Sequence, residues 1–124
     1  NKKVSVANFL GNLPSGAPIG FSSETVSTAA TLSNTTTISF VAAAATILGD
    51  GTVDGQLKII AATDVTTTCD VDFIDSAGTT ATVTFQAVGE SVSCIYDGTG
   101  SKWHIIAYGA TGTGNNIVGT QDVT

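Results

Sequence analysis

The clearest strand pattern in the chain is TCDVDF, residues 68–73. Successive side chains of a β-strand point to opposite faces of a sheet, so this alternation directs the cysteine, valine and phenylalanine inward and both aspartates outward. The turn residues SAG follow at 76–78, and a second alternating run at 80–86 returns along the first. Residues 68–86 therefore predict a hairpin with one buried face.

Two runs upstream of this hairpin are also predicted to be strands. In residues 36–41, apolar and hydroxyl side chains alternate. In residues 56–62, the alternation predicts that Leu57 and Ile59 point inward and Lys58 points outward. Both segments are therefore expected to contribute one apolar face to a common core.

Between these two runs lie an alanine-rich segment and a turn. The four alanines at 42–45 have high helix propensity, but so short a run cannot nucleate an isolated helix. They predict a tight strand corner or one short turn. The stretch GDGTVDG at 49–55 contains two Asp-Gly steps, which are typical of turns.

Downstream, Val92, Cys94 and Tyr96 share one face of a predicted strand, and DGTG at 97–100 closes a hairpin onto residues 102–108. The sequence thus predicts seven or eight short strands and no credible helix, and it shows no internal repeat of fixed period. Short strands separated by turns predict an all-β fold, either an antiparallel β-sandwich or a jelly-roll-like barrel.

The first 24 residues differ in character from the rest of the chain. They contain both prolines, Pro14 and Pro18, and only one segment able to pair as a strand. We expect residues 1–24 to form an extended arm and residues 25–124 one β-sandwich domain, with a Gly/Thr-rich tail from about residue 109. The arm residues expected to bind a partner are Lys2, Lys3, Val4, Val6, Phe9 and Leu10.

The composition excludes several functions. The chain has 124 residues, 21 Thr, 11 Ser, four Lys, no Arg and a formal net charge of −6. Nucleic acid and anionic membrane surfaces are poor partners, because almost nothing could neutralise their phosphates. No apolar run has the length of about 18 residues that a membrane-spanning helix needs. Hydroxyl groups and backbone, rather than charges, are expected to form the surface.

Catalytic candidates are few. His104 is the only possible imidazole base, but it lies mid-strand and no nucleophile-elbow motif is present, so we interpret it as a structural or surface residue. Asp70 and Asp72 share a strand face, as the paired carboxylates of a glycosidase would, yet any exposed strand with two acids has this spacing. We expect no catalytic residue, no cofactor and no enzymatic activity.

Metal ligands are equally sparse. Asp50 and Asp54 supply hard oxygen ligands of the kind that calcium prefers, but a turn explains them equally well, and they remain a weak calcium candidate. Two cysteines and one histidine lack zinc-site spacing. Cys69 and Cys94 are interpreted as reduced and buried, with a disulfide left as the alternative.

The aromatic residues are assigned mainly to the core. Sugar or receptor binding needs exposed aromatic rings, whereas Trp103, Tyr96 and Tyr108 all fall within strand patterns. Two are therefore expected inside the sandwich and one at an edge or interface.

Three stretches carry a resemblance to a known class: DGQLKII at 54–60, TVTF at 82–85 and ESVSCIYDGTGSKW at 90–103. They resemble small all-β virion modules of tailed bacteriophages, which occur as trimeric capsid decoration (cement) proteins and as distal domains of tail fibres. Upstream, residues 31–40 fit the same pattern, so the resemblance covers roughly residues 25–108.

The resemblance implies a structural virion protein that binds the outer surface of a phage shell as a homotrimer and stabilises it. Its partners would be the major capsid protein and its own copies, with assembly in the host bacterial cytoplasm, where both cysteines would stay reduced. A tail-fibre or tailspike receptor-binding module is the alternative. That module would need a sugar groove or exposed aromatics and a longer chain with a stem, so this short chain favours decoration.

Overall fold

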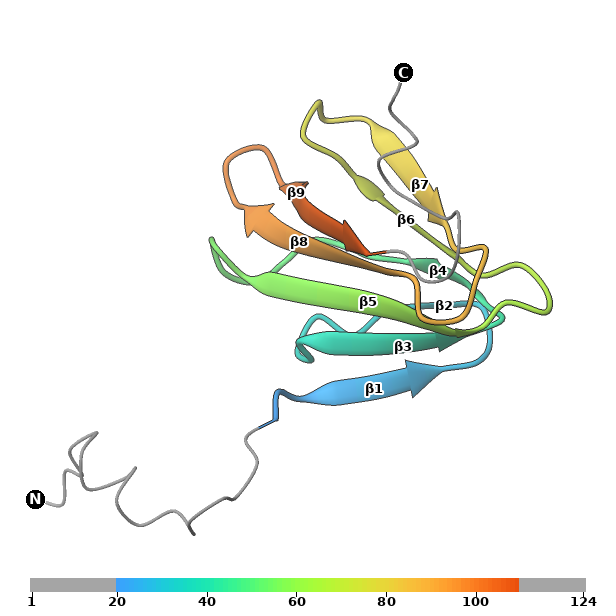
Figure 1. Cartoon of the computed structure of the whole chain (residues 1–124). Helices are drawn as coiled ribbons and strands as arrows, with labels where there is room; N and C mark the ends of the chain where they lie inside the picture. The colour runs from blue at the N-terminus through green and yellow to red at the C-terminus, as the bar shows by residue number, and fades with distance from the viewer. Residues whose placement is uncertain (1–19, 110–124) are drawn as a thin grey trace, which may run out of the picture.

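The computed structural model describes residues 20–109, which form two facing β-sheets and no helix (Figure 1). The predicted all-β class is confirmed. The expected arm contacts Lys2, Lys3, Val4, Val6, Phe9 and Leu10, and the tail from residue 110, lie outside the described residues.

Nine strands make up the two sheets, where seven or eight were expected. The five-stranded sheet has the order β1-β3-β5-β8-β9, with bounds Ser23–Val26, Ile38–Ala42, Leu57–Asp64, Ser91–Asp97 and Lys102–Gly109. The four-stranded sheet has the order β2-β4-β6-β7, with bounds Ala30–Thr31, Ala45–Ile47, Asp70–Ile74 and Thr80–Thr84. Strand β1 thus includes two residues that the sequence assigned to the arm.

The pairing direction corrects the antiparallel prediction. Strands β1, β3 and β5 are parallel, as are β2, β4 and β6, whereas β5-β8-β9 and β6-β7 are antiparallel. The chain alternates between the sheets, so the return path from β1 to β3 runs through β2 on the opposite sheet. Parallel neighbours need such a crossover connection. Of the expected antiparallel sandwich or jelly-roll-like barrel, only the two-sheet architecture is therefore confirmed.

The first six strands wind as coils of unequal length. Ser23 pairs with Ile38, 15 residues later, and Ile38 pairs with Ile59, 21 residues later. A coiled fold with a fixed repeat would show a sequence period. Because the connections lengthen along the chain, no such period is visible in the sequence.

The alanine run makes the tight corner that was predicted as one of two alternatives. Strand β3 ends at Ala42 and β4 begins at Ala45, so the chain crosses from one sheet to the other within two residues. Ala43 adopts a φ of 51°, and its N–H donates to the Asp64 carbonyl (2.6 Å). Small side chains fit this corner, where Ala44 is buried.

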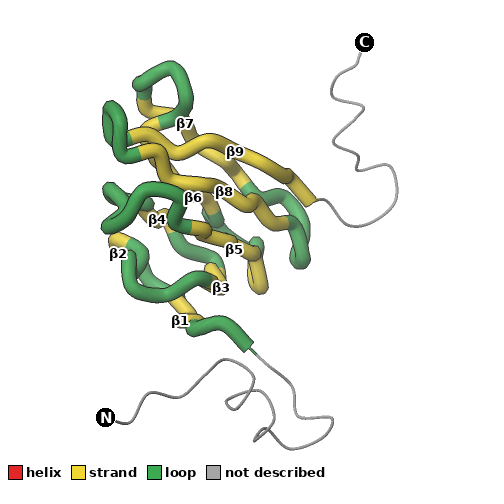
Figure 2. Tube along the Cα trace, turned by 90° about the vertical axis from the view of Figure 1, so that its left-hand side faces the viewer, coloured by secondary structure: helices red, strands yellow, loops and turns green. Residues whose placement is uncertain are grey.

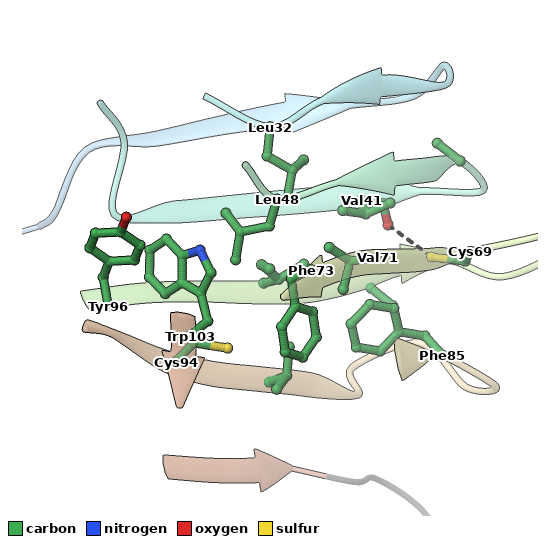
Figure 3. Packing of buried hydrophobic residues seen from close by; sticks show 14 residues of the cluster. Leu32, Val41, Leu48, Cys69, Val71, Phe73, Phe85, Cys94, Tyr96 and Trp103 are labelled. Carbon is green, nitrogen blue, oxygen red and sulfur yellow. Dashed lines mark hydrogen bonds between the residues drawn. The ribbon is translucent and has the colours of Figure 1, made fainter. Parts of the chain in front are cut away.

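The core lies between the sheets (Figure 3). The predicted inward residues of the 68–86 hairpin, Cys69, Val71 and Phe73, are buried, as are Val92, Cys94 and Tyr96 of β8. Trp103 is 1% exposed, and its ring stacks obliquely against Tyr96 at 5.0 Å between centroids. The indole N–H donates to the carbonyl of Gly49 (2.9 Å), which joins β9 to the loop after β4.

The facing predicted for β5 is wrong. Lys58, Ile60 and Ala62 are buried between the sheets, and Leu57 and Ile59 lie on the outer face. The Lys58 ammonium is accommodated by acceptors that are remote in sequence. These are the carbonyls of Ser33 (2.6 Å) and Thr36 (2.9 Å) and the Thr36 hydroxyl (3.0 Å).

Candidate functional site

The strand registers bring apolar side chains together on the outer face of the five-stranded sheet. They place Ile38 beside Ile59, Phe40 beside Ala61, and Leu57 beside Ile95. All six side chains are half-buried, although no strand of the described residues lies over this face (Figure 1). A sheet face of this kind is suited to contact with protein.

Charged groups on this face lie at its two ends. Asp97, Lys102 and His104 occupy one end, and Asp64, which pairs with Ala42, occupies the other. The central rows of the face carry no ionisable side chain within residues 20–109.

A polar network behind this face holds the first strand in place. Glu24 of β1 accepts a hydrogen bond from the Ser39 hydroxyl (2.5 Å) and another from the Ser33 N–H (2.8 Å). Its carboxylate lies 3.9 Å from the Lys58 ammonium. Burial lowers the pKa of Lys58, and the negative charge of Glu24 partly opposes that effect. The network therefore ties β1 and the loop after β2 to the central strand β5.

The structure places His104 between two partners that the sequence did not indicate. The Ser76 hydroxyl lies 2.7 Å from His104 Nδ1, and Asp97 Oδ2 lies 3.0 Å from His104 Nε2. Ser76 belongs to the turn between β6 and β7, Asp97 ends β8, and His104 lies on β9. Only Asp97 and His104 belong to one predicted hairpin, so local pattern could have suggested that pair but not the serine.

The aspartates of β6 occupy the outer face of the other sheet. Asp70 and Asp72 line one shallow groove of about 420 Å³ together with Ala29 and residues of β2 and β4. The Thr82 hydroxyl donates to Asp72 (2.6 Å), whereas burial, followed by the charge of Asp72, raises the pKa of Asp70. The outward facing of this pair is as predicted, and no aromatic side chain lines the groove.

The weak calcium candidates are not brought into one ligand set. Asp54 accepts a hydrogen bond from the Gly98 N–H (2.9 Å). Asp50 lines an adjoining apolar groove of about 290 Å³ together with Asp72 and Trp103. Within the part of the chain that is described, no three His, Cys, Asp or Glu side chains gather in a way that could hold a metal ion.

Both cysteines are free and buried, which agrees with the favoured interpretation of the sequence. Burial raises the pKa of Cys94 to about 12 and also raises that of Cys69. Neither thiol is therefore suited to act as a nucleophile at neutral pH.

A third groove lies beside the start of β1. It has a volume of about 340 Å³, and its rim includes the exposed Phe21 (66%) and Val53 (61%) as well as Leu57 of the outer face. Tyr96 and Trp103 are core residues, as expected, and Tyr108 packs partly buried against the core.

No protein-family model matches the chain, and neither a curated protein nor a solved structure matches it. The described residues contain no helix that is long and apolar enough to cross a membrane.

Proposed function

We propose that this chain is a structural module of a tailed-phage virion that decorates the outer surface of the shell as a homotrimer. The sequence resemblance over residues 25–108 supports the virion class. The proposed protein-binding role is supported by the apolar outer face of the five-stranded sheet. This face is formed by Ile38, Phe40, Leu57, Ile59 and Ile95.

This face is the place where copies of an acidic chain can meet at low electrostatic cost. The chain has a net charge of −6 and only four lysines, so most contacts between copies would bring like charges together. The central rows of the outer face contain no ionisable group, and burying their apolar surface contributes about 25 cal/mol per Å². We therefore assign this face to contact between copies.

Contact with the major capsid protein is assigned to the N-terminal segment. Lys2 and Lys3 carry half of the lysine charge of the chain, and the apolar Val4, Val6, Phe9 and Leu10 follow them closely. In this proposal, the lysines pair with acidic groups of the shell. Deletion of residues 1–20 should abolish binding to isolated shells and leave the β-sheet circular dichroism spectrum unchanged, whereas undiminished binding would refute this assignment.

The outer face is tested by Ile59→Lys, with Val88→Lys as the matched control. Val88 is an exposed apolar residue (57%) in the loop between β7 and β8, away from the outer face. Analytical ultracentrifugation in the presence of shell fragments should show trimers for the wild type and Val88→Lys, and monomers for folded Ile59→Lys. Trimers of Ile59→Lys would contradict the assignment.

A tail-fibre or tailspike module is the second candidate, and the coiled winding favours it. Strands β1 and β2 are edges of the two sheets, and both lie at the same end of the parallel coils. Within residues 20–109, the free edges of β1 and β2 have no further strand beside them, and they could accept another coil, as in a longer fibrous stack. Gold labelling of intact particles distinguishes the two functions, because label at the tail tip would favour the fibre and label over the shell would favour decoration.

A further inference from the structure

Ser76, His104 and Asp97 form a continuous hydrogen-bonded chain at the surface. The two contacts measure 2.7 Å from serine to imidazole and 3.0 Å from imidazole to carboxylate. The residues come from three separate segments, and the link from the β6–β7 turn to β9 also connects the two sheets. The arrangement is therefore a product of the tertiary fold.

Acid–base chemistry decides the direction of the hydrogen bonds. An ionised carboxylate can only accept, so the imidazole N–H at Nε2 donates to Asp97. The hydrogen bond from His104, followed by one from the Thr99 N–H, lowers the pKa of Asp97 and keeps its carboxylate ionised. In the neutral imidazole, Nδ1 then has a free lone pair, and the Ser76 hydroxyl donates to it. This is the protonation pattern of a serine paired with its general base.

Both ends of the hydrogen-bonded series, Asp97 and Ser76, are held in place by their own turns. The Thr99 N–H donates to Asp97 Oδ1 (2.9 Å). The Asp75 carboxylate accepts from the N–H groups of Ala77 (2.9 Å) and Thr79 (3.1 Å), which orders the turn that carries Ser76. The N–H of Ser76 makes no hydrogen bond within the described residues, which leaves it free to serve as an oxyanion donor in the proposal below.

We propose that Ser76 is a nucleophile for small carboxylic esters, with His104 as its general base and Asp97 as the positioning residue. Ser76 Oγ attacks the ester carbonyl carbon while its proton moves to His104 Nδ1. The tetrahedral intermediate then expels the alcohol, which takes the proton from His104, and an acyl-serine remains. Water, deprotonated by the same imidazole, attacks the acyl-serine and releases the carboxylic acid and free Ser76.

The surroundings define the substrate class and the rate. The side chains of His104 and Asp97 are 41% and 36% exposed, and none of the three grooves described above includes Ser76. An open site of this kind gives neither part of the ester a pocket, so it fits small carboxylic esters such as acetates. With a single N–H available for the oxyanion, turnover will be slow compared with hydrolases that provide two donors. The activity would be additional to the structural function proposed above and does not depend on it.

The test is covalent labelling of the folded protein with a fluorophosphonate probe, followed by peptide mass spectrometry. We expect one adduct, on Ser76, and none on the wild type unfolded in urea. His104→Ala should slow labelling by about 10²-fold or more, which is the usual contribution of a general base, and Asp97→Asn should slow it by a smaller factor. Ser27→Ala, which changes an exposed serine in the loop between β1 and β2, should label at the wild-type rate.

A second experiment uses p-nitrophenyl acetate as the substrate. Ser76 should become acetylated in the wild type but not in His104→Ala. Circular dichroism confirms that each variant is folded. The proposal is overturned if the folded wild type gives no adduct, if the adduct lies on another residue, or if His104→Ala labels as fast as the wild type.

Discussion

At the scale of single residues, the buried ammonium of Lys58 organises the polar interior of the five-stranded sheet. Its three short contacts are with groups 22 and 25 residues away in sequence, and its side chain is fully buried. A buried charge is tolerated only where hydrogen bonds replace its hydration. Lys58 therefore fixes the path of the loop after β2 as well as its own strand.

Replacing Lys58 with methionine keeps most of the apolar stem and removes the donor. The carbonyls of Ser33 and Thr36 then lose the ammonium, and Glu24 loses its nearby positive charge. We expect Lys58→Met to lower the free energy of unfolding by about 1–3 kcal/mol, measured by urea denaturation. Lys102→Met, which removes a lysine from the surface end of β9, should change it by less than about 0.5 kcal/mol. Equal effects of the two variants would contradict this role of Lys58.

At the scale of elements, the loop between β4 and β5 packs directly on the aromatic core. A Cβ atom added at Gly51 would lie 2.5 Å from Tyr96 Cγ and 2.9 Å from the Gln56 side-chain oxygen. The absence of a side chain at this position is therefore what lets the loop approach the ring. The Asp-Gly pattern predicted a turn here, but it did not show that the turn contacts Tyr96.

Gly51→Ala should therefore be destabilising. The added methyl group forces Tyr96, and with it the neighbouring Trp103, out of position, at a cost of about 1–3 kcal/mol. Gly98→Ala is the control, because its Cβ would lie no closer than 3.8 Å to Asp54. Thermal unfolding should show a clear decrease in Tm for Gly51→Ala and little change for Gly98→Ala. If both variants have the Tm of the wild type, the result contradicts the close packing of Gly51 against Tyr96.

At the scale of the whole molecule, the contact between Ser76 and His104 links the turn of one sheet to the edge strand of the other. Asp97 orients the imidazole by accepting a hydrogen bond from His104 Nε2, and this hydrogen bond lowers the pKa of Asp97. A carboxyl group whose folded-state pKa lies below its unfolded value near 3.8 stabilises the fold above that value. This stabilisation is lost as the pH falls through the folded-state pKa.

Asp97→Asn should consequently be less stable than the wild type at neutral pH, and the difference should shrink as the pH falls below about 4. Urea unfolding at a series of pH values from 7 to 3 would measure this convergence. Asp50→Asn removes the same charge from the loop between β4 and β5 and controls for net charge. A difference between Asp97→Asn and the wild type that stays constant with pH would show that the carboxylate does not act in this way.

Local alternation predicted the strands of the 68–86 hairpin and the inward faces of β6 and β8 correctly. Each strand shows its two faces within five or six residues, and burial of one face acts on that short stretch. The same rule failed for β5, where both faces carry apolar residues and the inner one includes a lysine. Alternation alone could not identify the inner face, because acceptors from a distant loop satisfy the ammonium.

The sequence by itself determined an all-β chain with a weakly charged, hydroxyl-rich composition, a buried Cys-Val-Phe strand face and turns at its Asp-Gly steps. These properties depend on residues that are close together along the chain. Only the tertiary structure decided the parallel winding of β1 to β6, the inward Lys58 and the meeting of Ser76 with His104 and Asp97. Each of these depends on which segments become neighbours in space, and that follows from how the two sheets pack together as a whole.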